Sequence, residues 1–198
     1  MRIREIPIQT RSVAGNFFSY KNKRVVKFES QLEKKCFLFL EFDKSIQSYI
    51  EQPLNIGRYV PDVLAKRNNN KNLLIEVKYY DEVEKMDERL ERKINTLQEY
   101  CDKNNLEFKF FTEKDIEEPY FSNISFIYNY AGITLSEDEK KKIISYIQKY
   151  NGVSLNKLAK EGFNMAFIYK MIFDEILDIN LFKKLSTDSI VRINYDRT

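Results

Sequence analysis

Short apolar segments and amphipathic helical stretches alternate along the first 118 residues of the chain. Residues 73–80, which are mostly apolar and aromatic, form the strongest predicted strand. Apolar residues recur at spacings of three and four over 30–43 and 81–100, which predicts two helices. Further strands are predicted at 17–20, 25–28, 46–50, 54–56, 59–65 and 106–111. This order predicts an α/β fold, with a mixed sheet flanked by helices.

Local signals refine these elements. Ser30-Gln31-Leu32-Glu33 has the form of a capping box, so the first helix is expected to begin at Ser30. Pro61 lacks a backbone donor, which tends to place the 59–65 strand at a sheet edge or the proline at a bulge. Residues 112–115 predict a short helix after the last of these strands.

The pattern becomes helical after Pro119, which marks the predicted domain boundary. Domains are therefore expected over residues 1–118 and 119–198. In the second domain, Ser136-Glu137-Asp138-Glu139 is another capping box that begins a helix. Two more helices are predicted at 154–161 and 164–176, with short strands within 177–195.

Histidine is absent from the sequence. This excludes Ser-His-Asp and Cys-His nucleophile systems, His-containing zinc sites and nucleases that use a His general base. Hydrolytic chemistry would have to use carboxylates, Lys, Tyr or a metal-activated water. Cys36 and Cys101 lie far apart and are expected to be reduced thiols of a cytoplasmic protein. No apolar stretch is long enough for a transmembrane helix, and the N-terminus lacks a signal peptide's apolar region, so no membrane association is expected.

Positive charge is concentrated at the N-terminus. Residues 1–27 carry seven Lys or Arg residues and one Glu, although the whole chain has a net charge of only +3. Phosphate contact by this basic segment is one explanation, and an ordinary solvated surface is the other. Lys21, Lys23 and Arg24 are the candidate DNA-binding residues of the segment.

Pro61-Asp62 and Glu76-Val77-Lys78 carry the candidate catalytic chemistry. Side chains alternate along a strand, so Glu76 and Lys78 are expected on one face. If 59–65 and 73–80 pair as a hairpin, Asp62 lies beside Glu76. Two carboxylates on neighbouring strands form an oxygen-rich site for Mg²⁺, with Mn²⁺ as a substitute. Lys78 could then orient the attacking water and stabilise the charge that develops on the phosphate.

The same residues also allow a plainer interpretation, in which Glu76 and Lys78 form a salt bridge on a solvated sheet face. The apolar run before Glu76 favours a buried strand that carries charge. Glu33 is the third candidate carboxylate, because a helix can bring it to the open end of the sheet. It is also the expected partner of Ser30 in the capping box, and Glu29 is the alternative acidic residue.

Four sequence blocks, taken in order, resemble the N-terminal endonuclease domain of TnsA over roughly residues 7–115. The blocks are Ser19-Tyr20-Lys21 to Glu33, Leu40-Glu41-Phe42-Asp43 with Gln52-Pro53, Tyr59-Val60-Pro61-Asp62, and Leu74-Ile75-Glu76-Val77-Lys78. The resemblance implies a restriction-endonuclease-like fold and a metal-dependent DNA endonuclease. It implies an active site with three metal-binding carboxylates and a lysine, which here are Glu33, Asp62, Glu76 and Lys78. Some members of the family have Gln at the position of Glu76.

The resemblance also implies a biological setting. The enzyme would cut the non-transferred strand of double-stranded DNA at transposon ends, together with a separate DDE-type strand-transfer transposase. The family's second domain is helical and winged-helix-like and contacts the AAA+ ATPase regulator of transposition, which implies the same role for residues 119–198. A bacterial cytoplasmic protein is therefore expected.

Two other functions stay open from the sequence alone. One is a stand-alone phage or repair nuclease with the same domain, and the other is a catalytically silent DNA-binding or assembly subunit. A neighbouring DDE transposase and ATPase gene would favour the transposase subunit over the stand-alone nuclease. The intact set of three acidic residues and a lysine argues against the silent subunit.

Overall fold

The computed structural model describes residues 13–195 of the 198-residue chain. The chain divides into two compact units, Met1–Ile116 and Glu117–Thr198. The boundary expected after residue 118 lies close to this division. Arg2, Arg4 and Arg11, which contribute to the N-terminal charge, lie outside the described residues.

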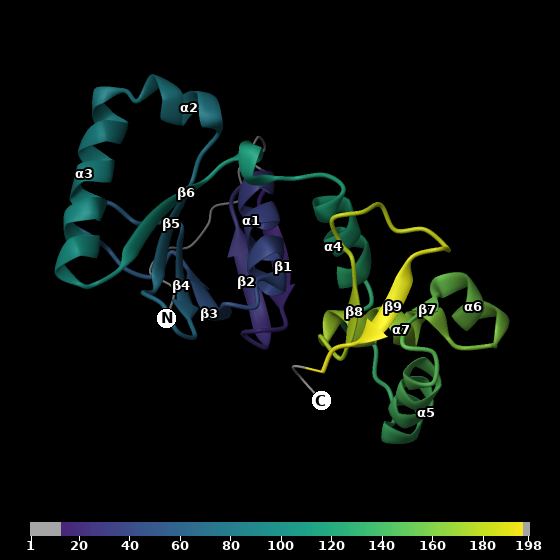
Figure 1. The fold of residues 1–198 in the computed structure, drawn as a ribbon. Coiled ribbons are helices and arrows are strands. Elements are labelled where there is room, and N and C mark those ends of the chain that lie inside the picture. The colour runs from purple at the N-terminus through teal and green to yellow at the C-terminus, as the bar shows by residue number, and fades with distance from the viewer. Residues whose placement is uncertain (1–12, 196–198) are drawn as a thin grey trace. The chain divides into compact units, whose positions relative to one another are not determined.

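The first unit is built around a four-stranded mixed sheet (Figure 1). In spatial order, its strands are β3 (Ile46–Glu51), β4 (Val63–Arg67), β5 (Leu73–Val77) and β6 (Glu107–Phe111). The first three are antiparallel neighbours, whereas β6 runs parallel to β5 and needs a helical crossover to reach it. Every residue of β5 is buried, as expected for a strand covered on both faces. The predicted mixed sheet with flanking helices is confirmed.

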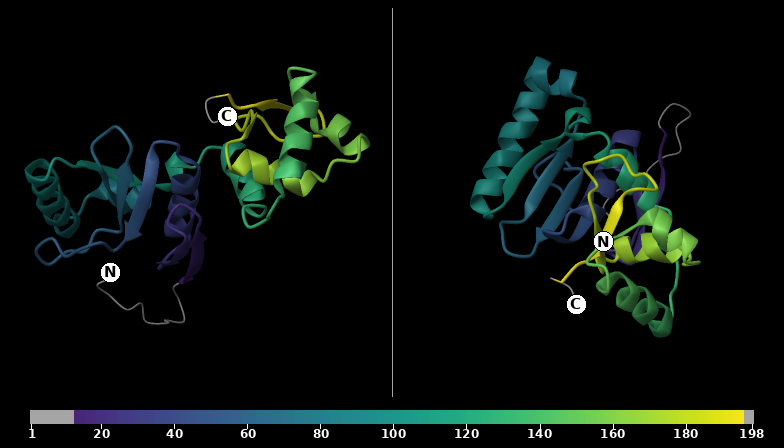
Figure 2. Two further views of the ribbon diagram at one scale, coloured as in Figure 1. Left: turned by 90° about the horizontal axis from the view of Figure 1, so that it is seen from below. Right: turned by 45° about the vertical axis from the view of Figure 1, so that its right-hand side comes forward.

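A hairpin and a helix precede this sheet in the chain. The hairpin pairs β1 (Gly15–Ser19) with β2 (Arg24–Phe28), and α1 (Gln31–Phe42) follows. Helix α1 packs on one side of the sheet, where Phe37 stacks on Tyr49 with ring centroids 5.6 Å apart. Helix α3 lies on the other side, as Figure 1 and Figure 2 show. The expected turn between β1 and β2 and the helix start at Ser30 are both confirmed.

The single helix predicted over 81–100 is wrong, because the chain forms two helices there. They are α2 (Tyr80–Lys85) and α3 (Glu88–Lys103). Met86 adopts a left-handed conformation with φ 33° between them, and Asp87 begins the second helix by accepting a hydrogen bond from the N–H of Leu90 at 2.7 Å. The predicted short helix after β6 is a 3₁₀ turn, η1 (Glu113–Asp115).

The strand predicted at 54–56 is also wrong. Only an isolated bridge between Ile56 and Tyr59 forms in this segment. Pro53 cannot donate a ladder hydrogen bond, and the side chain of Ile56 is buried against α3 and β5 instead. The buried members of this core are Ile56, Leu74, Ile94, Leu97 and Cys101. The segment between β3 and β4 is therefore a loop that is fixed by packing against α3.

Strand β4 differs from its prediction in position. It begins at Val63 rather than at residue 59, and it lies between β3 and β5 rather than at an edge. Pro61 precedes the strand, so its missing donor and its restriction of Val60 leave the ladder intact. Asp62 consequently sits where the chain enters the sheet.

The second unit combines helices with a small antiparallel sheet. Its helices are α4 (Tyr120–Tyr128), α5 (Glu137–Gln148), α6 (Leu155–Lys160) and α7 (Met165–Phe173). Its strands, in spatial order, are β7 (Val153–Ser154), β9 (Ile190–Ile193) and β8 (Leu177–Ile179). The predicted capping box at Ser136 and the short strands are confirmed. Within residues 13–195, no helix combines the length and apolar character needed to cross a membrane.

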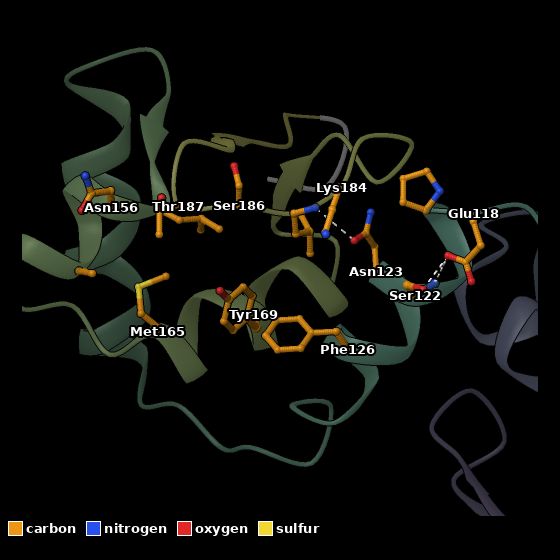
Figure 3. A pocket seen from close by; sticks show the side chains of 14 residues that line it. Glu118, Ser122, Asn123, Phe126, Asn156, Met165, Tyr169, Lys184, Ser186 and Thr187 are labelled. Atoms are coloured by element: carbon orange, nitrogen blue, oxygen red, sulfur yellow. Dashed lines mark hydrogen bonds between the residues drawn. The ribbon is translucent and has the colours of Figure 1, made fainter.

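The second unit contains a cavity of about 630 Å³ with a mainly apolar wall (Figure 3). Phe126, Met165 and Tyr169 line it, together with the segment 184–187. Asn123 holds that segment in place: its side-chain oxygen accepts from the N–H of Leu185 at 3.3 Å, and its amide nitrogen donates to the preceding carbonyls of Leu181 and Lys183 at 2.7 and 2.8 Å. A buried amide on α4 therefore shapes this cavity.

Candidate active site

Asp62 and Glu76 are brought together by the pairing of β4 with β5. Val63 pairs with Ile75 in antiparallel register, which places the preceding Asp62 opposite Glu76. The Asp62 carboxylate accepts a hydrogen bond from the backbone N–H of Val77, with Oδ2 at 2.7 Å from the nitrogen. The predicted hairpin is confirmed, and the two carboxylates are neighbours at the end of the sheet.

All four predicted site residues line one cavity of about 310 Å³ in the first unit. Glu33 enters it from the start of α1, and Asp62 enters from the residue before β4. Glu76 comes from β5, and Lys78 follows that strand directly. The convergence expected from the sequence is therefore present in the structure.

Glu33 lies in the first turn of α1, and both of its carboxylate oxygens accept hydrogen bonds. Its Oε2 accepts from the backbone N–H of Glu29 at 2.9 Å, and its Oε1 accepts from the Ser30 hydroxyl at 3.1 Å. The expected capping box is thus altered, because Glu33 returns to the N–H of Glu29 rather than to that of Ser30. Glu33 supports the helix start and faces the cavity at the same time.

Two lysines contact the buried carboxylate of Glu76, and only Lys78 is predicted from the sequence. Lys78 Nζ lies 3.8 Å from Glu76 Oε1, and Lys93 of α3 forms a direct ion pair with the same oxygen. Glu76 is 0% exposed, so these cations offset the energetic penalty of burying its charge. The sequence does contain a feature that could have identified Lys93: it lies three residues after Leu90 and four before Leu97, which places it on the apolar face of α3.

Two buried oxygen atoms in the cavity have no hydrogen-bond partner within the described part of the chain. They are Oε2 of Glu76 and Oε1 of Gln52. Gln52 adopts φ 44°, and its amide nitrogen donates to Glu29 Oε1 at 2.8 Å, which turns its oxygen away from that partner. Gln52 belongs to one of the sequence blocks that resemble TnsA, but the sequence pattern predicts no role for its side chain.

These oxygens fit a divalent cation of the magnesium type. Residues 13–195 contain no group of three or more His, Cys, Asp or Glu side chains arranged to hold a metal. Mg²⁺ does not need such a cage, because it is commonly held by one or two carboxylates, with water and substrate phosphates completing its six ligands. Asp62 and the free oxygen of Glu76 meet that requirement, and unpaired buried oxygens are otherwise unfavourable.

Burial and mutual repulsion raise the pKa of all three carboxyl groups. Desolvation raises the pKa of Glu76 to about 7, and the neighbouring charge of Asp62 adds to the effect. Desolvation likewise raises the pKa of Glu33 to about 7, and the pKa of Asp62 is raised above its usual value by burial. A bound cation would reverse this effect by favouring the charged forms.

The raised pKa values predict how the stability of the metal-free protein depends on pH. Folded Glu33 and Glu76 keep their protons up to a pKa of about 7, whereas the unfolded chain releases them near 4.5. The folded state therefore binds more protons in this window, so the free energy of unfolding should fall as pH rises from about 4.5 to about 7. At about 1.4 kcal/mol for each unit of pKa, the expected loss is about 3 kcal/mol for each of the two groups.

Urea unfolding of the full chain with a chelator, measured across this pH range, checks the prediction. Glu76→Gln should reduce the dependence by about half, because Glu33 still titrates, whereas Glu99→Gln, at an exposed position of α3, should leave it unchanged. A stability that rises through the window would contradict the assigned protonation states.

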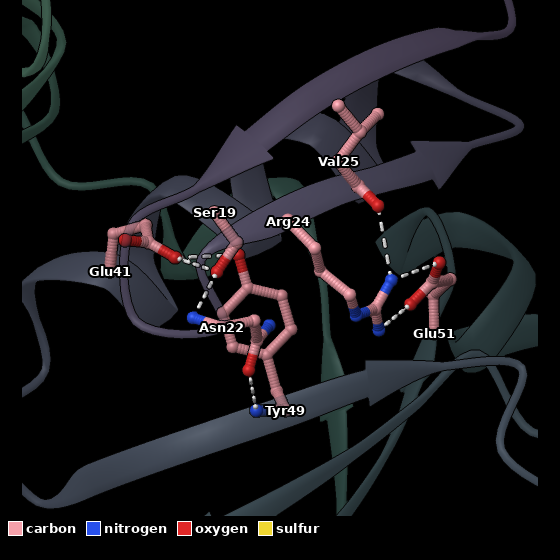
Figure 4. A network of polar contacts seen from close by, with 7 residues as sticks. All are labelled: Ser19, Asn22, Arg24, Val25, Glu41, Tyr49 and Glu51. Atoms are coloured by element: carbon pink, nitrogen blue, oxygen red, sulfur yellow. Dashed lines mark hydrogen bonds and ion pairs between the residues drawn. The ribbon is translucent and has the colours of Figure 1, made fainter. Parts of the chain in front are cut away.

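At the turn between β1 and β2, two of the three predicted DNA-binding residues have partners within the protein. Arg24 forms a two-point ion pair with Glu51, with nitrogen–oxygen distances of 2.9 and 2.5 Å (Figure 4). Lys21 Nζ donates to the carbonyls of Asp43 and Ile46. Both cations therefore have structural roles that the charge pattern did not reveal. DNA binding by Lys21, Lys23 and Arg24 stays a prediction.

A mixed sheet flanked by helices, with paired carboxylates and a lysine at the end of a central hairpin, fits the class of restriction-endonuclease-like proteins. Residues 22–113 match the family model of the TnsA-like endonuclease N-terminal domain. Over these residues, the first unit is similar to a TnsA-like endonuclease domain. A search of curated proteins gave no match to the chain.

Proposed function

We propose that the protein is a metal-dependent DNA endonuclease subunit of a heteromeric transposase. It would hydrolyse the non-transferred strand at transposon ends. The observation that carries this proposal is the convergence of Asp62, Glu76 and Lys78 in one cavity of a TnsA-like nuclease domain. The orphaned oxygen of Glu76 supports the choice of Mg²⁺, or Mn²⁺ in its place, as the cofactor.

Five side chains of the cavity have distinct parts in this chemistry. When bound, a divalent cation lowers the pKa of water and neutralises charge on the phosphate. Asp62 and Glu76 would supply the acidic oxygens that hold it, and Gln52 would supply a neutral oxygen. Lys93 keeps Glu76 oriented through Oε1, which leaves Oε2 free. Lys78, which is 31% exposed, can donate a hydrogen bond to the scissile phosphate.

The partners of this subunit are proposed from the family resemblance. They are double-stranded transposon-end DNA, a DDE-type strand-transfer transposase and an AAA+ ATPase regulator in a bacterial cytoplasm. The second unit would be a winged-helix-like domain that contacts the ATPase. Its order of α6, α7 and the β8–β9 pair, with β7 on the same sheet, supports this proposal.

Strand cleavage of labelled transposon-end DNA tests the proposal, with partner subunits added if the isolated chain is silent. The wild-type chain should cut one strand in Mg²⁺ or Mn²⁺ and should stop when EDTA is added. Lys78→Ala should lower the cleavage rate roughly 100-fold or more, because loss of one charge-stabilising donor has effects of that order. Metal binding by this variant, measured by calorimetry, should stay near the wild-type value.

Lys103→Ala is the matched control, because Lys103 is 76% exposed and pairs only along its own helix with Glu99 within the described structure. It should cut at the wild-type rate. Cleavage that persists in EDTA would contradict metal dependence. If Lys78→Ala and the wild type cut at equal rates, Lys78 has no role in the reaction.

A further inference from the structure

A second cavity of about 360 Å³ lies in the first unit, outside the proposed active site. Its wall is formed by the loop between β3 and β4 and by one side of α3. The lining residues are Gly57, Arg58, Tyr59, Arg92, Asn95 and Thr96. The described lining thus contains two guanidinium groups and no carboxylate.

The loop that carries Arg58 is held in a defined shape. Ile56 and Tyr59 exchange backbone hydrogen bonds of 2.8 and 3.1 Å, and Gly57 makes the turn between them with φ 61°. The buried side chain of Ile56 anchors this turn against α3. The Arg58 guanidinium lies over the Tyr59 ring at 5.3 Å and donates to its hydroxyl at 3.2 Å. Arg58 is therefore preorganised although it is exposed.

Arg92 faces the same cavity from α3 and is available to a ligand. Its described ion pair is with Glu88, one turn away, at 3.4 Å, where the two side chains are 60% and 88% exposed. Pairs of this exposed kind contribute little free energy, so a phosphate can replace the carboxylate. Arginine suits this exchange because its planar guanidinium can bind a phosphate through two parallel hydrogen bonds.

The two cavities adjoin each other along the same two segments. Tyr59 lines the second cavity, and the next residue, Val60, lines the proposed active site. On α3, Arg92 lines the second cavity, and the next residue, Lys93, lines the proposed active site. Consecutive Cα atoms are about 3.8 Å apart, so the walls of the two cavities are neighbours along this loop and along α3.

We propose that Arg58 and Arg92 bind phosphate groups of the DNA duplex next to the bond that is cut. This inference rests on the proposed nuclease function and identifies a substrate-binding surface for it. The surface is separate from the hairpin turn at Lys21–Arg24. It would fix the position of the strand while Asp62, Glu76 and Lys78 act on the scissile phosphate.

The test measures binding of the full chain to a labelled duplex oligonucleotide at several salt concentrations, without divalent metal. Arg58→Ala/Arg92→Ala should reduce the slope of log K against log salt by about two units, one for each lost phosphate contact. At 0.1 M salt this corresponds to roughly 50-fold weaker binding. Arg58→Lys/Arg92→Lys should keep most of the slope, because the charges are retained.

Lys85→Ala/Lys103→Ala is the matched control, since it removes two charges that are 79% and 76% exposed in the same unit. The control should bind like the wild type. The phosphate site is refuted if Arg58→Ala/Arg92→Ala loses no slope, or if the lysine control loses as much slope as this variant does. The nuclease proposal stands in either case. If the wild-type chain binds no DNA even with partner subunits, the proposed function and this inference both fall.

Discussion

Asp62→Ala should abolish strand cleavage in Mg²⁺ or Mn²⁺. Asp62 faces Glu76 across the hairpin, and both carboxylates line the same cavity. We expect a rate loss of more than roughly 100-fold, because even groups that only support a metal ligand change activity by about 10–100-fold. Calorimetry should show weakened Mn²⁺ binding in the same variant.

The same substitution should leave the fold in place. Asp62 is not fully buried, and its loss removes the repulsion that raises the pKa of Glu76. It also removes the acceptor of the Val77 N–H, at an expected cost of about 1–3 kcal/mol. Asp62→Asn keeps an acceptor at that position, so it should melt closer to the wild type while cutting no better than alanine.

Two results would overturn the assignment of Asp62. If Asp62→Ala cuts as fast as the wild type, the active site lies elsewhere. If the alanine and asparagine variants both unfold, Asp62 is structural, and the salt-bridge interpretation of Glu76 and Lys78 becomes the better one. Thermal melts run beside the cleavage assay separate these outcomes.

The sequence predicted the part of the site that depends on strand geometry. Alternation along β5 and pairing with β4 were sufficient to place Glu76 beside Asp62, because both follow from backbone geometry. Gln52 and Lys93 were not predicted as site residues. Each reaches the cavity through tertiary packing: Gln52 from a left-handed loop position, and Lys93 from the crossover helix α3.

The differences in secondary structure have similar physical causes. The helix over 81–100 was predicted from a continuous apolar stripe, but the break depends on Met86 and on the cap that Asp87 provides. The loop after Pro53 has apolar residues like a strand, yet its side chains pack on α3. Local patterns identify apolar positions, and tertiary contacts decide which element they form.

Charge was the least informative of the sequence signals at the hairpin turn. Lys21 and Arg24 raised the expectation of a DNA-binding segment, but the structure gives each of them protein partners. Those partners come from residues more than 20 positions away in the chain. No sequence pattern links Arg58 with Arg92, in contrast, and they become a pair only through the packing of the loop against α3.

A buried carboxylate explains how that hairpin turn is fixed to the rest of the first unit. Glu41 of α1 is 5% exposed and accepts hydrogen bonds from the hydroxyls of Ser19 and Tyr49 at 2.6 and 2.8 Å (Figure 4). It also accepts from the backbone N–H groups of Tyr20 and Lys21 at 3.0 and 3.2 Å. One side chain therefore joins α1, the β1–β2 turn and β3.

Glu41→Ala should consequently destabilise the first unit by about 3 kcal/mol or more. Hydrogen bonds to a charged group contribute about 1.5–3 kcal/mol each, and their loss leaves buried donors without an acceptor. In a domain of this size, the change corresponds to a fall in Tm of at least roughly 12 °C. Glu41→Gln keeps one acceptor oxygen and should lose about half as much.

Urea unfolding gives the free energy, and hydrogen exchange read by mass spectrometry locates the loss. Exchange of the amides of Tyr20 and Lys21 should accelerate first, because their acceptor is removed. Glu99→Ala, which removes an exposed carboxylate from α3, should change stability by less than about 0.5 kcal/mol. If Glu41→Ala is no less stable than this control, the turn is held by its other contacts, and Glu41 does not fix it.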